Sequence, residues 1–179
     1  YDDVMNYQRE IVYNRRNYSL HEQDISDELN EIINEYIDDI LDDFCSSSSN
    51  INWNFDGLNN ELLNIFALDM KINENSNNLK DLKQTIIDGT AAILKFKEEN
   101  FDLKMFNDFK KFIILRTIDQ KWQDHLYMMD QLREGINLRA YGQKNPLIEY
   151  KQEGFAMFEL MMVETNKETL KRIFRTNLS

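Results

Sequence analysis

The sequence predicts an all-α protein that is organised around a long antiparallel pair of helices. Apolar residues recur every three or four positions from residue 115 to residue 136, which keeps one face of a helix apolar throughout. These residues are Leu115, Ile118, Trp122, Leu126, Met129, Leu132 and Ile136. The 179 residues include one proline and five glycines, so few positions favour a break in a helix. A hydrophobic fraction of 42% is sufficient for a buried core.

The first expected helix covers residues 1–18. One face of this helix is marked by Val4, Tyr7 or Gln8, Ile11 and Val12. The pattern starts at the first residue, without a capping side chain before it and without a signal peptide. We therefore expect this segment to be the end of a longer helix from which the chain is an excised piece.

A second helix is expected to start at Asp24 or Ser26, either of which can cap free amides, and to end near Phe44. Its apolar face consists of Ile25, Leu29, Ile32, Ile33, Tyr36, Ile40 and Phe44. Its other face is acidic and consists of Glu28, Glu31, Glu35, Asp38, Asp39, Asp42 and Asp43. A solvated face is favoured over a cation site, because calcium loops need turn glycines and alternating ligands.

The middle of the chain predicts two shorter helices separated by polar loops. A linker from Cys45 to Asn54 is expected to be anchored by Trp53 and Phe55. The helices are expected at residues 58–66 and 79–99, and the joint to the next helix is expected at Asn100-Phe101-Asp102. Because Cys45 is the only cysteine, an internal disulfide and a cysteine-rich zinc site are both excluded.

Two long helices complete the chain. The first begins at Leu103 and runs for about 35 residues, or about 50 Å. The second begins at Pro146, where Asn145 can cap the helix and proline suits the first turn. A short link between long helices makes them antiparallel. The second helix is expected to be apolar on the side of Ile148, Phe155, Phe158 and Met162, and its methionines favour packing over a substrate groove.

The link between the long helices carries an unusual set of side chains, namely Arg139, Tyr141, Gly142, Gln143 and Lys144. A tyrosine flanked by cations at the end of a stiff helical pair can serve as a contact device for a partner. The same residues also fit a solvated turn whose tyrosine packs back on its own helices. The sequence pattern leaves both interpretations open.

The net charge of −11 is divided unevenly along the chain. Residues 1–102 hold 8 basic and 22 acidic side chains, a net charge of −14, whereas residues 103–179 hold 13 and 10, a net charge of +3. The acidic part argues against nucleic-acid binding, which needs a basic surface. The slightly basic part suits an anionic membrane surface or the acidic loops of a partner.

Catalytic motifs are missing from the sequence. The five glycines are too scattered for a phosphate-binding loop, and Cys45 has no basic neighbour in sequence. His125 follows Trp122 by three residues on the same helix face, which favours a hydrogen-bonded packing histidine over a catalytic one. We therefore predict that the chain is not an enzyme by itself and that it holds no cofactor or metal.

Two blocks of the sequence resemble the SecA family, the ATP-driven motors of bacterial protein export. Residues 115–158, LRTIDQKWQDHLYMMDQLREGINLRAYGQKNPLIEYKQEGFAMF, are similar to the two-helix finger of SecA. The opening YDDVMNYQREIVYNRR is similar to the end of its long scaffold helix, and the segment between the blocks resembles its helical wing. The resemblance implies a scaffold-helix end at residues 1–18, a wing domain at 19–102, and a finger with the C-terminal scaffold helix at 103–179.

The resemblance also implies a role and a set of partners. The finger of the family enters the cytoplasmic mouth of the SecY channel and contacts the unfolded preprotein through its tip, here Tyr141 with Arg139, Gly142, Gln143 and Lys144. Residues at the base of the finger, here Trp122, His125, Leu126 and Met129, are expected to pack on the scaffold and to regulate ATP hydrolysis. ATP and Mg belong to motor domains of the full-length protein, which is expected to be cytoplasmic and peripherally bound to the inner face of the cell membrane.

A different class of function fits the same sequence. A stand-alone helical interaction module, either an adaptor or a holdase, could use the methionine-rich and aromatic helical pair. The start of the chain within a helical pattern speaks against this alternative.

Overall fold

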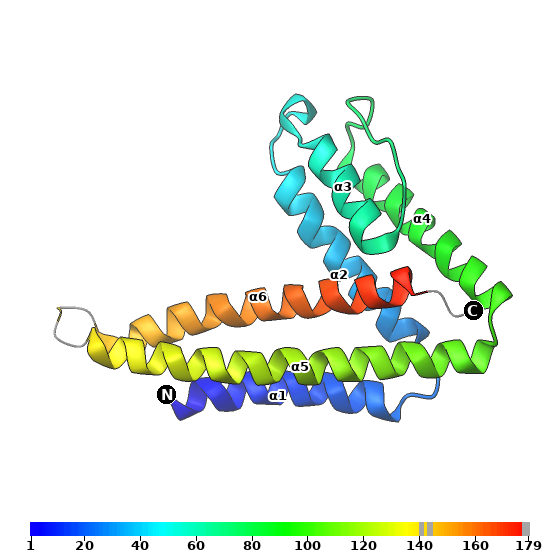
Figure 1. Cartoon of the computed structure of the whole chain (residues 1–179). Helices are drawn as coiled ribbons and strands as arrows, with labels where there is room; N and C mark the ends of the chain where they lie inside the picture. The colour runs from blue at the N-terminus through cyan, green and yellow to red at the C-terminus, as the bar shows by residue number, and fades with distance from the viewer. Residues whose placement is uncertain (140–141, 143–144, 177–179) are drawn as a thin grey trace. The chain divides into compact units, whose positions relative to one another are not determined.

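The computed structural model describes residues 1–139, 142 and 145–176, and this part of the chain is all-α (Figure 1). The prediction of the fold class is confirmed. The described residues form the helices α1 (Asp2–His21), α2 (Ser26–Phe44), α3 (Phe55–Phe66), α4 (Leu79–Asn100), α5 (Leu103–Leu138) and α6 (Pro146–Arg175), with a short 3₁₀ turn η1 (Asn50–Asn52). None of these helices combines the length and the hydropathy that crossing a membrane requires.

The chain divides into two compact units. The first unit contains Tyr1–Gln23 and Ile114–Thr165, and the second contains Asp24–Ile113 and Asn166–Ser179. Each of the long helices α5 and α6 therefore contributes residues to both units. The division into three parts at residues 19 and 103 concerns the domains of the resembled family and stays a prediction.

The first unit is built from α1 and the facing parts of α5 and α6. Its core contains Met129, Leu132, Ile136 and Tyr150, with Tyr1, Val4, Met5 and Met157 packed around them. Residues on α5 and α6 pair in opposite chain directions: Arg139 contacts Glu153, and the rings of His125 and Phe158 lie 5.7 Å apart. In this unit α5 and α6 therefore run antiparallel.

The second unit packs α2 against α3 and α4, together with the last turns of α6. Its largest buried side chains form a line of aromatic contacts: the rings of Tyr36 and Phe66 lie 6.1 Å apart, and those of Phe66 and Phe174 lie 4.9 Å apart. Lys97 is also buried here, and its Nζ donates to the carbonyl oxygen of Thr176 at 2.9 Å. These contacts join α2, α3, α4 and α6 into one core.

Side-chain caps define where several helices begin. The Oδ1 of Asn78 accepts hydrogen bonds from the amides of Lys80 and Asp81 at 3.0 and 3.2 Å, at the start of α4. The carboxylate of Asp102 accepts from the amide of Met105 at 2.9 Å, at the start of α5. Such caps satisfy amides that have no partner within the helix. The break between α4 and α5 thus falls at the predicted joint, residues 100–102.

Several predicted helix faces are wrong in detail. Ile148 and Phe155, predicted to be buried, are 53% and 56% exposed, whereas Tyr150 and Gly154 are buried. Phe158 of the predicted face is buried, but the rest of the buried face is rotated toward Tyr150 and Gly154. Glu28, predicted on the acidic face of α2, is only 7% exposed, because it lies one turn before the buried Ile32.

Candidate functional site

The end of α5 carries part of the predicted contact residues. The amide of Arg139 donates to the carbonyl oxygens of Gly135 and Ile136 at 3.1 and 3.0 Å. The amide of Gly142 donates to the carbonyl oxygen of Arg139 at 3.0 Å. These bonds close the last turn of the helix. The other three predicted contact residues, Tyr141, Gln143 and Lys144, lie outside the described residues.

Arg139 forms an ion pair with α6. Its Nη1 lies 2.7 Å from Oε1 of Glu153, and the two side chains are 50% and 44% exposed. The hydrogen bond and the charge of Glu153 raise the pKa of Arg139 above its ordinary value. An exposed pair of this kind adds little stability. It places the guanidinium group of Arg139 beside Glu153 of α6.

The start of α6 is defined by the predicted cap. The Oδ1 of Asn145 accepts from the amides of Leu147 and Ile148 at 3.0 and 3.4 Å, and Pro146 is the first residue of the helix. Proline suits this position because the amide it lacks would have no helical partner. The prediction of the cap and of the first residue is confirmed.

The four residues predicted at the base of the helical pair lie on α5. Trp122, His125 and Met129 are 5%, 3% and 1% exposed, and Leu126 is half-buried. The rings of Trp122 and His125 lie 5.6 Å apart. Trp122 and Met129 are thus core residues of the first unit, and a bound partner cannot contact them without rearrangement of the core.

A buried polar junction joins all three helices of the first unit. The Nε2 of His125 on α5 lies 2.7 Å from Oε1 of Gln8 on α1, and Nε2 of Gln8 donates to the carbonyl oxygen of Gly154 on α6 at 3.3 Å. Burial lowers the pKa of His125 below its ordinary value. The sequence left Tyr7 and Gln8 as alternatives for this face, and the structure buries Gln8 while Tyr7 is 63% exposed.

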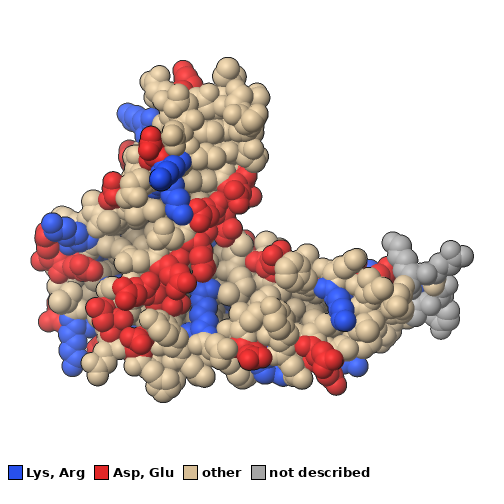
Figure 2. All heavy atoms as spheres, turned by 180° about the vertical axis from the view of Figure 1, so that it is seen from behind, with Lys and Arg blue, Asp and Glu red and all other residues tan. Residues whose placement is uncertain are grey.

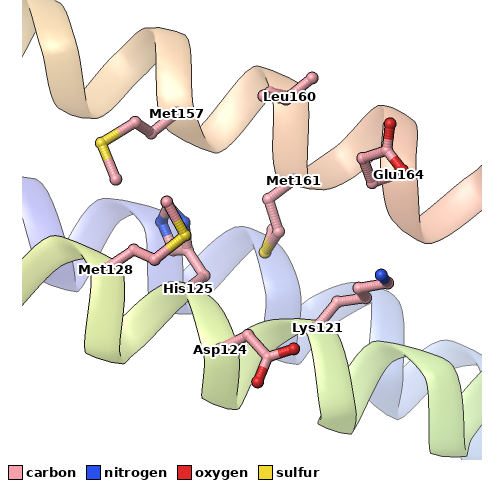
Figure 3. A pocket seen from close by; sticks show the side chains of 8 residues that line it. All are labelled: Lys121, Asp124, His125, Met128, Met157, Leu160, Met161 and Glu164. Carbon is pink, nitrogen blue, oxygen red and sulfur yellow. The ribbon is translucent and has the colours of Figure 1, made fainter.

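A methionine-lined groove of about 220 Å³ lies between α5 and α6 in the first unit. Figure 3 shows Met161 reaching from α6 toward α5 and Met128 reaching from α5 toward α6. The groove is lined by Lys121, Asp124, His125, Met128, Met157, Leu160, Met161 and Glu164. Thioether side chains adapt to apolar groups of different shapes, so the groove suits an apolar side chain of variable form. The sequence favoured packing of these methionines over a groove, because the groove also needs side chains of α5 that lie far from α6 in the sequence.

A second groove of about 260 Å³ lies between α1 and α6. It includes the exposed aromatic residues Tyr7 and Phe155, together with the buried Phe158, and Asp3 and Lys151 supply charges. The first unit therefore presents apolar hollows on two sides of α6.

The acidic face of α2 forms the strongest concentration of charge in the second unit. Figure 2 shows Asp and Glu side chains gathered in a band that follows this helix. Asp38 forms an ion pair with Lys83 at 2.7 Å. Partial burial and the neighbouring carboxylates, with Asp42 and Asp43 the strongest, raise the pKa of Asp39. The carboxylates of this face therefore lie close enough to repel one another.

The described residues offer no arrangement for metal or nucleophilic chemistry. Within them, no three side chains of His, Cys, Asp or Glu are grouped to hold a metal ion. Cys45 is buried, and burial raises the pKa of its thiol, which disfavours the reactive thiolate. The described surfaces consist of the two apolar grooves and the acidic face of α2, which suit contact with a partner.

The chain is similar to known proteins over its whole length. A family model described as the SecA Wing and Scaffold domain matches residues 1–177. Three relatives are described as protein translocase subunit SecA. The one from Vesicomyosocius okutanii subsp. Calyptogena okutanii is 34% identical over 100% of this chain and 20% of the relative. Those from Rickettsia canadensis and Acetivibrio thermocellus are 36% and 32% identical, over 97% and 99% of this chain and 19% and 20% of the relatives. The chain spans about a fifth of the length of these relatives.

Proposed function

The chain belongs to the SecA wing and scaffold family, and we propose that it couples ATP hydrolysis in SecA motor domains to the movement of an unfolded preprotein through the SecY channel. ATP and Mg bind in the motor domains under this proposal, and the present chain supplies the mechanical part. The curated relatives are named as protein translocase subunits, which supports a role in protein transport.

The observation that carries the proposal is the bracing of α5 by α6 and α1 within the first unit. The α5 segment of this unit, residues 114–138, is about 37 Å long at 1.5 Å per residue. It is held by the core around Met129 and Ile136 and by the buried junction at His125. A continuous helix supported on two sides bends little under load, so it suits the transmission of a displacement.

The proposed contact with the preprotein lies at the link between α5 and α6. We assign it to Tyr141, with Arg139, Gly142, Gln143 and Lys144 shaping the surroundings of the ring. An aromatic ring contacts apolar groups without reading a particular sequence, as transport of many different preproteins requires. The groove around Met128 and Met161 supports the proposal, since it offers adaptable apolar surface on the same helices.

The base of the helical pair has a second proposed task, the restraint of ATP hydrolysis. Trp122, His125, Leu126 and Met129 would hold α5 in the position at which the motor domains are restrained. Their burial supports this task, because a shift of α5 would change its packing. The net positive charge of residues 103–179 supports peripheral association with an anionic membrane at the cytoplasmic face.

The proposal is tested by substitution of Tyr141 in full-length SecA carrying this chain. We expect Tyr141→Ala to reduce preprotein transport severalfold, because the ring is lost, and Tyr141→Phe to have a milder effect. Tyr127→Ala is the matched control, since Tyr127 is a 66% exposed tyrosine on α5. Transport into membrane vesicles is the measurement, and circular dichroism checks that the helix content is kept. Normal transport by Tyr141→Ala would exclude the contact.

A photo-crosslinking amino acid at position 141 gives a direct readout of the neighbours. In a stalled transport complex we expect crosslinks to the preprotein or to the cytoplasmic loops of the channel. Crosslinks confined to α5 and α6 would mean that residue 141 packs on its own helices, which contradicts the proposed contact.

A further inference from the structure

We propose that Gln8 fixes the register of α1 against α5 and α6, so that α1 cannot slide by one helical turn without breaking the buried junction. Gln8 is 3% exposed and lies in the middle of α1. Both ends of its amide are used, the oxygen with Nε2 of His125 and the nitrogen with the carbonyl oxygen of Gly154. One side chain of α1 is therefore bonded to both neighbouring helices.

The residues one turn away from Gln8 cannot replace it. Sliding α1 by one turn, about 5.4 Å, would place Val4 or Val12 opposite His125. The other neighbours at helical spacing, Met5 and Ile11, are also apolar. None of these four side chains can accept the hydrogen bond of His125, whose ring is 3% exposed. A buried donor without a partner is costly, so the shifted register is disfavoured about 10- to 100-fold.

The apolar contacts of α1 specify its register less strongly than this junction does. Val4, Met5 and Val12 differ modestly in volume, and cores accept hydrophobic replacements of similar volume at low cost. A single polar residue in an apolar contact face is a known way to set register, because its partner exists at one position only. Among the three buried residues of α1, Gln8, Val12 and Ser19, Gln8 is the one that hydrogen-bonds to the other helices within the described residues.

The other side of the junction is closely packed. A Cβ atom added to Gly154 would lie 2.8 Å from Cε of Met129, so α6 approaches α5 closely at this residue. The carbonyl of Gly154 and the ring of His125 therefore present one fixed pair of partners to α1. The exposed ion pair between Arg16 and Asp119, at 2.7 Å, also links α1 to α5, but solvent screening makes it weak.

The decisive test moves the polar residue by one turn. We would compare the wild-type chain with the double variant Gln8→Val/Val12→Gln, which keeps the amino-acid composition. Spin labels at the exposed positions Asn17 on α1 and Gln131 on α5, in a Cys45→Ala background, report sliding along the common axis. We expect one distance in the wild-type protein and a distance changed by about 5 Å in the double variant. An unchanged distance in a folded double variant would overturn the proposal.

A single substitution supplies a second readout. Gln8→Met keeps the length of the side chain and removes its hydrogen bonds, so we expect a second distance population with retained helix content. Arg16→Met is the matched control, because it removes the exposed link from α1 to Asp119, and we expect the single wild-type distance. A single unchanged distance in Gln8→Met would also overturn the proposal, because register would then be set by apolar packing alone.

Discussion

His125 is held in its neutral form by its surroundings. The amide nitrogen of Gln8 donates to Gly154, so the amide oxygen of Gln8 accepts, and Nε2 of His125 carries the hydrogen. Burial lowers the pKa of the ring because the charged form loses solvation. The neighbouring charged groups in the groove are Lys121 and Asp124 on α5 and Glu164 on α6.

This pKa shift predicts a pH dependence of stability. The ring has a lower pKa in the folded chain than its ordinary value of 6.5 in the unfolded chain. The unfolded state therefore binds more protons as the pH falls through 6.5, and the free energy of unfolding decreases. We expect urea denaturation to show lower stability at pH 5.5 than at pH 7.5, with a smaller difference in His125→Gln. Equal pH dependence in the two proteins would contradict a buried neutral His125.

The end of α3 shows how a single backbone conformation closes a helix. Ala67 has a φ of 54°, in the left-handed region. Its amide donates to the carbonyl oxygen of Leu63 at 3.1 Å, and the amide of Leu68 donates to that of Leu62 at 3.3 Å. The bond from Ala67 to Leu63 is that of the αL motif at the end of a helix, in which glycine is the favoured residue because it has no Cβ.

Replacement of Ala67 by glycine should therefore stabilise the chain. The relief of left-handed strain exceeds the entropy that glycine adds to the unfolded state, and we expect a gain of about 0.5 to 1 kcal/mol. Chemical denaturation monitored by circular dichroism is the measurement. Ala92→Gly, at an exposed position within α4, is the matched control and should destabilise by about 1 kcal/mol. Destabilisation by both changes would refute the strain at residue 67.

The helices were predictable from sequence where local chemistry sets their limits. The cap at Asn145, the proline at residue 146 and the joint at residues 100–102 are local signals, and the structure contains each of them. The buried face of α6 was not predictable from apolar spacing, because one of its contact positions is Gly154. A glycine packs through its backbone, so it does not appear in a pattern of apolar side chains.

The candidate site was predictable to different degrees. The contact residues around Tyr141 came from resemblance to a family, because composition alone favoured a solvated turn. The role of Gln8 required the structure, since only the positions of His125 and Gly154 show why a polar residue is buried there. The groove at Met128 and Met161 required the pairing of α5 with α6. Contacts between distant segments are the part that a local pattern does not contain.

At the scale of the whole molecule, charge repulsion dominates the electrostatics. The net charge is −11, and much of it is concentrated on α2, where partial burial and the neighbouring carboxylates raise the pKa of Asp39. Like charges at such density destabilise a compact state. Salt screens interactions between exposed charges that lie farther apart than about 10 Å at 0.1 M ionic strength.

We therefore expect added salt to stabilise the chain. The melting temperature should rise by a few degrees between 20 and 300 mM NaCl, as measured by circular dichroism, because screening weakens the repulsion. Asp42→Asn/Asp43→Asn removes two exposed charges from α2, so this variant should melt higher at low salt and respond less to added salt. A melting temperature that falls with salt would mean that attractive pairs such as Arg16 with Asp119 outweigh the repulsion.

The side chain of Asn59 holds the loop between α3 and α4 at Ile72, with the paired hydrogen bonds that a neighbouring strand would form. The Oδ1 of Asn59 accepts from the amide of Ile72 at 3.0 Å, and its Nδ2 donates to the carbonyl oxygen of Ile72 at 2.9 Å. Both bonds end on the main chain, which every residue possesses. The genetic constraint therefore falls on codon 59, which must specify asparagine for both bonds to form. Codon 72 can specify any residue except proline, because every other residue has the main-chain amide hydrogen that the bond needs. A lost Asn59 has no compensating substitution at its partner position.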